Sequence, residues 1–227
     1  ILLFSFALRV FELEHLPPFE HPDGVSLAEY SLKVARGDVP WYGVRTDGDT
    51  NWAFLQYAPY ALFGGSLWAL RLTSALWSML VLTVTYFAVR QMFGARVALF
   101  AMLLMGCAHL LIHFSRAVTI VLPSVLTSFL SIGLYCKAQC ISADGRRSTG
   151  LWLLTGAVLA LNLYEYVAAR SVFFALAALW LLSLPRQRSA WRPYAHRMLL
   201  LAAGFLLIAA PILLWYFQHP NHLLDRF

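Results

Sequence analysis

The chain has 227 residues, of which 60% are hydrophobic and 12% charged, and its mean hydropathy is +0.67. This charged share is about half that of an ordinary soluble domain and excludes a water-soluble globular protein. The formal net charge is +6, but Lys and Arg mark the cytoplasmic loops of membrane proteins, so the excess does not indicate nucleic-acid binding. We therefore expect an all-α polytopic membrane protein, because helices satisfy their own backbone groups in lipid.

The chain begins with a short apolar run over residues 1–8, interpreted as the end of a first span, and continues into a long polar segment, 9–65. Six apolar stretches with about the length of a span follow. They are 66–89, 97–114, 118–138, 150–168, 170–185 and 198–217. Residues 218–227 are interpreted as the start of a further outer loop, and 1–227 as one transmembrane module from the N-terminal part of a longer protein.

Basic residues gather in three joints between the spans, 90–96, 137–149 and 186–197. These joints hold nine of the 17 Lys and Arg residues and a single acid, Asp144. The bias predicts that they are cytoplasmic, which places the 9–65 loop on the extracytoplasmic side. We expect an integral protein of a bacterial plasma membrane whose active site faces outward.

The outer loop contains eight of the chain's eleven acids, between Glu12 and Asp49. Residues 25–36 have apolar side chains at helical spacing and stop at Gly37, which predicts a helix lying on the membrane surface. The aromatic-rich piece 51–60 predicts a second interfacial helix.

Asp23 is the candidate general base. It precedes the predicted helix, and a carboxylate can take a proton from a hydroxyl nucleophile. The alternative is a helix cap, a common role of Asp before a helix.

Three arginines, Arg71, Arg116 and Arg170, lie where charge is expensive, near the outer ends of apolar segments. A guanidinium offers paired donors that fit a phosphate group. The set therefore predicts binding of an anionic lipid headgroup, with snorkelling or pairing to a loop acid as the alternative for each one.

Three other residues are secondary candidates. Glu165, flanked by tyrosines, is expected to pair with Arg170, and Glu29 lies on the predicted interfacial helix. His113 and His109, four residues apart, could form half a metal site, but no third ligand is adjacent and packing is favoured. The C-x3-C pair is likewise interpreted as structural, so no metal site is predicted.

Several short motifs, in order and over nearly the whole chain, resemble one family. They are Leu16-Pro17-Pro18 with Pro22-Asp23 ahead of Ala28-Glu29; Ala35-Arg36-Gly37-Asp38; Leu62-Phe63-Gly64 with Leu70-Arg71-Leu72; Phe93-Gly94-Ala95-Arg96-Val97-Ala98-Leu99; His113-Phe114-Ser115-Arg116; and Tyr164-Glu165-Tyr166-Val167-Ala168-Ala169-Arg170. The chain resembles the N-terminal part of a glycosyltransferase-C membrane enzyme, of the dolichyl-phosphate-mannose protein mannosyltransferase and aminoarabinose transferase type. The family often has Asp-Glu at the catalytic position, where this chain has Asp23-Gly24.

The resemblance implies a fold whose large first outer loop carries a catalytic acid, at the position of Asp23. It implies inverting transfer of a sugar from a polyprenyl-phosphate donor in membrane lipid to an unidentified acceptor, with Arg71, Arg116 and Arg170 near the lipid phosphate. The resemblance does not imply a particular cofactor, and it leaves open whether a divalent cation is required. The alternative is a non-catalytic membrane protein, a transporter or assembly subunit, that uses the outer loop for recognition.

Overall fold

The computed structural model describes residues 1–18, 20, 22–38, 59–63, 66–119, 121–141, 146–184 and 191–218. All the regular elements in these ranges are helices. In chain order they are α1 (Leu2–Val10), α2 (Pro22–Arg36), α4 (Leu67–Phe93), α5 (Ala95–Cys107), α6 (His109–Arg116), α7 (Val121–Cys140), α8 (Arg146–Leu161), the 3₁₀ helix η1 (Val167–Arg170), α9 (Ser171–Leu182) and α10 (Trp191–Gln218). The expected all-helical architecture is confirmed.

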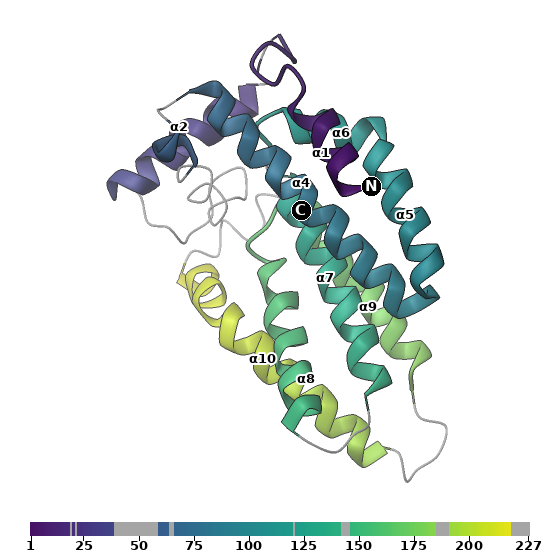
Figure 1. Cartoon of the computed structure of the whole chain (residues 1–227). Coiled ribbons are helices and arrows are strands. Elements are labelled where there is room, and N and C mark those ends of the chain that lie inside the picture. The colour runs from purple at the N-terminus through teal and green to yellow at the C-terminus, as the bar shows by residue number, and fades with distance from the viewer. Residues whose placement is uncertain are drawn as a thin grey trace.

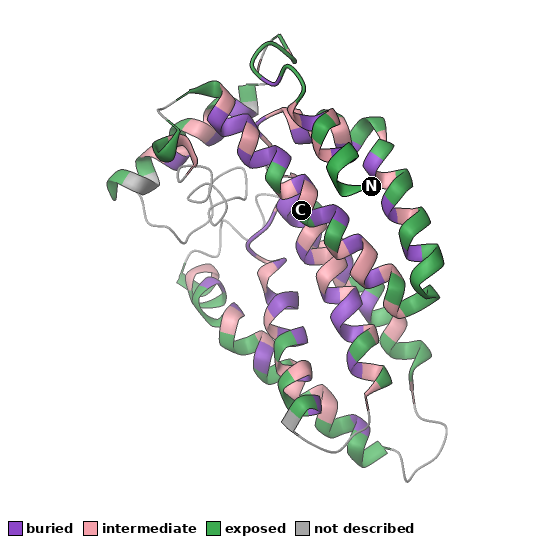
Figure 2. Ribbon diagram, in the orientation of Figure 1, coloured by how far each residue is buried: buried purple, intermediate pink, exposed green. Residues whose placement is uncertain are grey.

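The long helices lie side by side in one bundle, with α2 at one end (Figure 1). Buried residues line α4, α7 and α8, whereas the outer sides of α5 and α10 are exposed (Figure 2). Those exposed sides carry large apolar residues such as Phe100, Leu104 and Leu207. An apolar outer surface of this extent is what a helical bundle presents to lipid.

Three helices, α4, α7 and α10, are long and apolar enough to cross a membrane, and the bent pair of α5 and α6 gives a fourth candidate. Helices α8 and α9 are apolar but shorter. Helices occupy each of the six stretches expected to span, and the number of crossings stays a prediction.

The stretch 97–114, expected as one straight span, is broken at Ala108, where α5 and α6 meet at 58°. The buried guanidinium of Arg9 lies at this break. It donates to the carbonyl of Gly106 at 3.0 Å and to the hydroxyl of Ser78 at 2.7 Å. A polar side chain that takes up a carbonyl at a helix end is a recognised cause of a kink.

Helix α8 ends at Leu161, although the sequence predicted a span to residue 168. The buried side chain of Asn162 explains this difference. Its amide donates to the carbonyls of Val158 and Leu159, which a continuing helix would use for backbone bonds. Residues 162–166 therefore leave the helix before η1 begins.

Helix α2 begins at Pro22, three residues before the predicted start, and ends before Gly37, whose φ is 78°. Proline favours the first turn of a helix because its missing N–H is not needed there. Asp23, expected in a turn ahead of the helix, is thus within its first turn. Most of the second predicted interfacial piece, 51–60, lies outside the described residues.

Candidate functional site

The start of α2 is held by Glu20, which bridges two distant parts of the chain. One carboxylate oxygen, Oε2, accepts from Nε of Arg71 at 3.1 Å, and the other, Oε1, accepts from the backbone N–H of Val118 at 2.8 Å. The side chains of Arg71 and Glu20 are only 1% and 8% exposed. Glu20 therefore ties the chain just before α2 to α4 and to the connection between α6 and α7.

Arg71, near the beginning of α4, is fully engaged by the turn that follows α1. Besides Glu20, it donates to the carbonyls of Leu13, Glu14 and Pro17 at 3.0, 3.2 and 2.8 Å. In this arrangement its guanidinium organises the turn between α1 and α2. Contact with a phosphate would require it to exchange one of these carbonyls.

Arg116, the last residue of α6, forms hydrogen bonds to the same turn. It donates to the carbonyls of Leu8 at 2.9 Å, Phe11 at 2.6 Å and Leu16 at 3.3 Å. The structure thus brings two of the three predicted arginines together around residues 11–17. Both lie at the end of the bundle where α2 is attached.

Asp23 directly precedes a tightly packed glycine. A Cβ on Gly24 would lie 2.8 Å from the carbonyl oxygen of Val118 and 3.0 Å from Oε1 of Glu20. A larger residue would push α2 away from Val118, which gives a physical reason for Asp-Gly where the family often has Asp-Glu. The backbone of Asp23 is fixed by this packing, and its side chain lies outside the described part of the structure.

Glu165 is fully buried, in the irregular segment after α8, and accepts from the hydroxyl of Ser124 at 3.3 Å. Ser124 belongs to the first turn of α7, only six residues after Val118. Glu165 is therefore on the same side of the bundle as the Glu20 bridge. It was expected one helical turn before Arg170, but the helix has ended by this point.

Asn162 forms a buried polar cluster beside Glu165. Its carbonyl oxygen accepts from Thr127 and Ser128, both at 3.0 Å, and its amide donates to Ser131 at 3.2 Å. These hydroxyl residues follow one face of α7. The cluster fixes where α8 stops and hence where Glu165 lies.

Arg170 closes η1 and is half-buried. Its Nη2 donates to the hydroxyl of Tyr216, in the last turn of α10, at 3.2 Å. The structure therefore holds Arg170 by a different partner from the turn that engages Arg71 and Arg116.

The two remaining secondary candidates are exposed. Glu29 is on the solvent side of α2. The ring of His113 stacks on that of His109, with centroids 6.4 Å apart. Among the described residues, no three His, Cys, Asp or Glu side chains are grouped so that they could hold a metal ion.

Sequence reasoning did not single out Glu20 or Asn162. Glu20 was one of eight acids in the loop, and no local pattern distinguished it. Asn162 carried a usable signal, because an amide at the end of an apolar stretch is costly in lipid unless it is satisfied.

A family model for dolichyl-phosphate-mannose-protein mannosyltransferase matches residues 51–215. This match includes Arg71, Arg116 and Arg170 and begins after Asp23.

The fold is that of the crystal structure of ArnT from Cupriavidus metallidurans in the apo state, with a TM-score of 0.71 and 22% sequence identity. The match covers 97% of this chain and 41% of the ArnT chain. It extends over α2 and confirms the expected glycosyltransferase-C-like helical fold.

No curated protein matches the chain in sequence. The family match covers well over half of the 227 residues. On this basis the chain belongs to the dolichyl-phosphate-mannose-protein mannosyltransferase family.

Proposed function

We propose that this chain is part of a glycosyltransferase that moves a sugar from a polyprenyl-phosphate donor to an acceptor on the extracytoplasmic side of the membrane. Asp23 is the general base. The observation that carries the proposal is the bridge from Glu20 to Arg71 and Val118, which fixes the start of α2 at the end of the bundle where Arg71 and Arg116 meet. The family membership supports the lipid-linked donor.

The chemistry follows from these residue types. The carboxylate of Asp23 takes the proton of the acceptor's hydroxyl or amine as that group attacks the anomeric carbon. The acceptor attacks on the face opposite the lipid phosphate, and the bond from the anomeric carbon to that phosphate breaks. The configuration of the anomeric carbon therefore inverts. The lipid phosphate leaves with a negative charge, which a nearby guanidinium stabilises.

The three arginines have different roles in this proposal. Arg71 and Arg116 donate to backbone carbonyls between Leu8 and Pro17, so they set the shape of the outer loop. Arg170 is half-buried and donates to the hydroxyl of Tyr216, and a phosphate oxygen can take over this hydrogen bond. We assign contact with the departing phosphate first to Arg170. For Arg71 and Arg116 that contact stays a prediction.

The test uses the full-length protein and a polyprenyl-phosphate sugar. Asp23→Asn removes the base while keeping the size and the capping oxygen of the side chain, and we expect sugar transfer to fall by at least 100-fold. Asp38→Asn, on an exposed acid just after α2, is the control and should keep full activity. If the Asp23→Asn variant transferred sugar at the wild-type rate, Asp23 would not be the catalytic base. Solute movement without any sugar transfer by the wild type would favour a transporter.

A further inference from the structure

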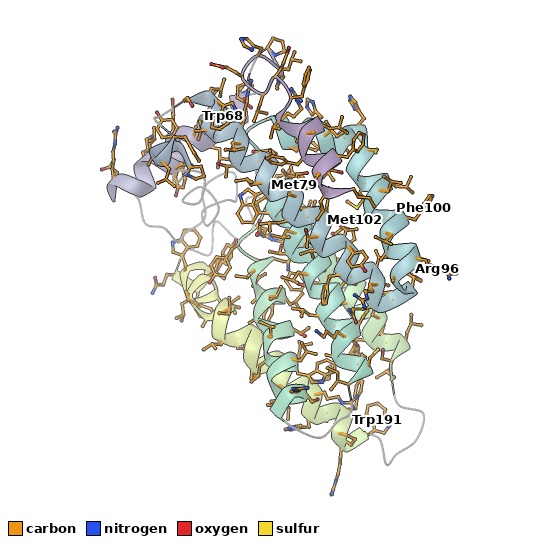
Figure 3. The ribbon with its side chains drawn as sticks, in the orientation of Figure 1. Trp68, Met79, Arg96, Phe100, Met102 and Trp191 are labelled. Atoms are coloured by element: carbon orange, nitrogen blue, oxygen red, sulfur yellow. The ribbon has the colours of Figure 1, made fainter. Side chains whose placement is uncertain are left out.

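A cavity of about 290 Å³ lies where α8 and α10 begin. It is lined by Ser148 and Thr149 on α8 and by Arg192, Pro193, His196 and Arg197 on α10. Trp191, the first residue of α10, lies at the opposite end of the bundle from Trp68, which is near α2 (Figure 3). The cavity is therefore separate from the site proposed above.

About two turns beyond the cavity, a glycine from each helix allows α8 and α10 to come into close contact. A Cβ on Gly156 would collide with the carbonyl of Leu201, and one on Gly204 would collide with the carbonyl of Leu153. Small residues at such positions let two backbones approach closely in a membrane. Both helices start at the same end of the bundle, as Figure 1 shows, so the contact also fixes the spacing of their first turns.

The lining is suited to an anion. Arg192, Arg197 and His196 can donate from nitrogen, Ser148 and Thr149 from their hydroxyls, and none of the lining residues is acidic. Ser148 and Thr149 belong to the first turn of α8, whose backbone N–H groups lack partners within the helix and carry the positive end of its dipole.

Arg197 supplies the most direct indication. Its Nε is buried and makes no hydrogen bond to the residues that the structure describes. A buried nitrogen of a charged group is costly to leave unpaired. Arg197 also lines the cavity, and a guanidinium binds phosphate oxygens with paired, strong hydrogen bonds.

We propose that this cavity binds a phosphate group, with Arg197 and Arg192 as its charged ligands. Two sources have this chemistry: the headgroup of an anionic lipid and free phosphate. The cavity is at the small end of the range for ligand pockets, about 300 Å³ and above, which suits a headgroup.

The experiment measures binding to the detergent-purified full-length protein at constant ionic strength, with two anionic probes. One is inorganic phosphate, and the other is a short-chain phosphatidic acid, with a phosphatidylcholine of equal chain length as the neutral reference. Arg197→Gln should weaken binding of the anionic probe roughly tenfold, because one charged hydrogen-bond pair is lost. Arg96→Gln, at an exposed arginine that projects from α5, should leave it unchanged.

Each outcome is decisive. If Arg197→Gln and Arg96→Gln differ only in their binding of inorganic phosphate, the ligand is free phosphate. If they differ only in their binding of phosphatidic acid, the ligand is a lipid headgroup. Equal binding by the two variants for both probes, or no binding by the wild type, overturns the proposal. Should Arg197→Gln fail to fold, Arg192→Gln alters an exposed ligand of the same cavity and carries the same expectation.

Discussion

Arg71 and Glu20 form a buried ion pair, with 3.1 Å between Nε and Oε2, across 51 positions of sequence. The pair joins the first turns of α4 to the chain that leads into α2. Because Glu20 also accepts from the backbone of Val118, its removal would leave a charge and a backbone N–H without their acceptor. The position of Asp23 therefore depends on this carboxylate as well as on the packing of Gly24 against Val118.

Replacing Glu20 by Ala should therefore destabilise the protein. Removing one partner of a buried pair leaves the other charge uncompensated, and we expect the free energy of unfolding to fall by about 3 kcal/mol. The measurement is unfolding in mixed detergent micelles. Glu29→Ala, at an exposed glutamate on α2, is the matched control and should change stability by less than about 0.5 kcal/mol. Equal effects of the two substitutions would contradict the role of Glu20.

Alanine at Gly156 or Gly204 should separate α8 from α10. Each new Cβ meets the backbone of the opposite helix, which cannot move aside as a side chain can, so we expect a loss of about 2 kcal/mol or more. Gly150→Ala is the control, since a Cβ there meets nothing within 4 Å. It should stabilise α8 slightly, by about 0.5–1 kcal/mol. Thermal unfolding of the three variants would show these opposite signs, and a common sign would refute the packing argument.

Asn162→Leu should leave the hydroxyl of Ser128 without its acceptor inside the bundle, whereas Thr127 keeps the backbone carbonyls of Pro123 and Ser124. We expect a loss of about 1–3 kcal/mol in unfolding free energy. Sugar transfer by the full-length enzyme should also fall, because Glu165 follows the end of α8 that Asn162 defines. Gln139→Leu removes one amide hydrogen bond, to Tyr135, and is the control. If activity falls no further with Asn162→Leu than with Gln139→Leu, the cluster is only structural.

Arg170→Gln should raise the KM for the lipid-linked donor and lower kcat, because the guanidinium is proposed to contact the phosphate before and after it leaves. Tyr216→Phe removes one hydrogen bond to Arg170 and keeps its guanidinium, so its kinetic effect should be less than about threefold. Steady-state kinetics with the donor varied distinguishes the two. A larger effect of Tyr216→Phe would show that Tyr216, rather than the phosphate, is the important partner.

The sequence predicted most of the helices because their signals are local. Long apolar runs, the charged joints between them and the stop at Gly37 are all visible within a short window of residues. The signal from the arginines is also local. Placing a charge in an apolar segment is energetically costly, which identified Arg71 and Arg116 as residues that must have partners.

The partners themselves could not be predicted. Arg71 reaches a carbonyl 58 residues away and Arg116 one 105 residues away. Such pairs depend on which helices are neighbours, a property that no local pattern encodes. The break at Ala108 is of the same kind, since it coincides with the approach of Arg9 from α1 rather than with a proline nearby.

Arg9 also has a consequence for the order in which the chain is assembled. A guanidinium in a helix that stands alone in lipid is expensive, and two of its acceptors, Ser78 and Gly106, are synthesised about 70 and 100 residues later. Until α4 and α5 arrive, α1 has only the carbonyl of Ser5 to offer this side chain. The guanidinium of Arg9 therefore has the acceptors seen in the folded protein only when α4 and α5 lie beside α1.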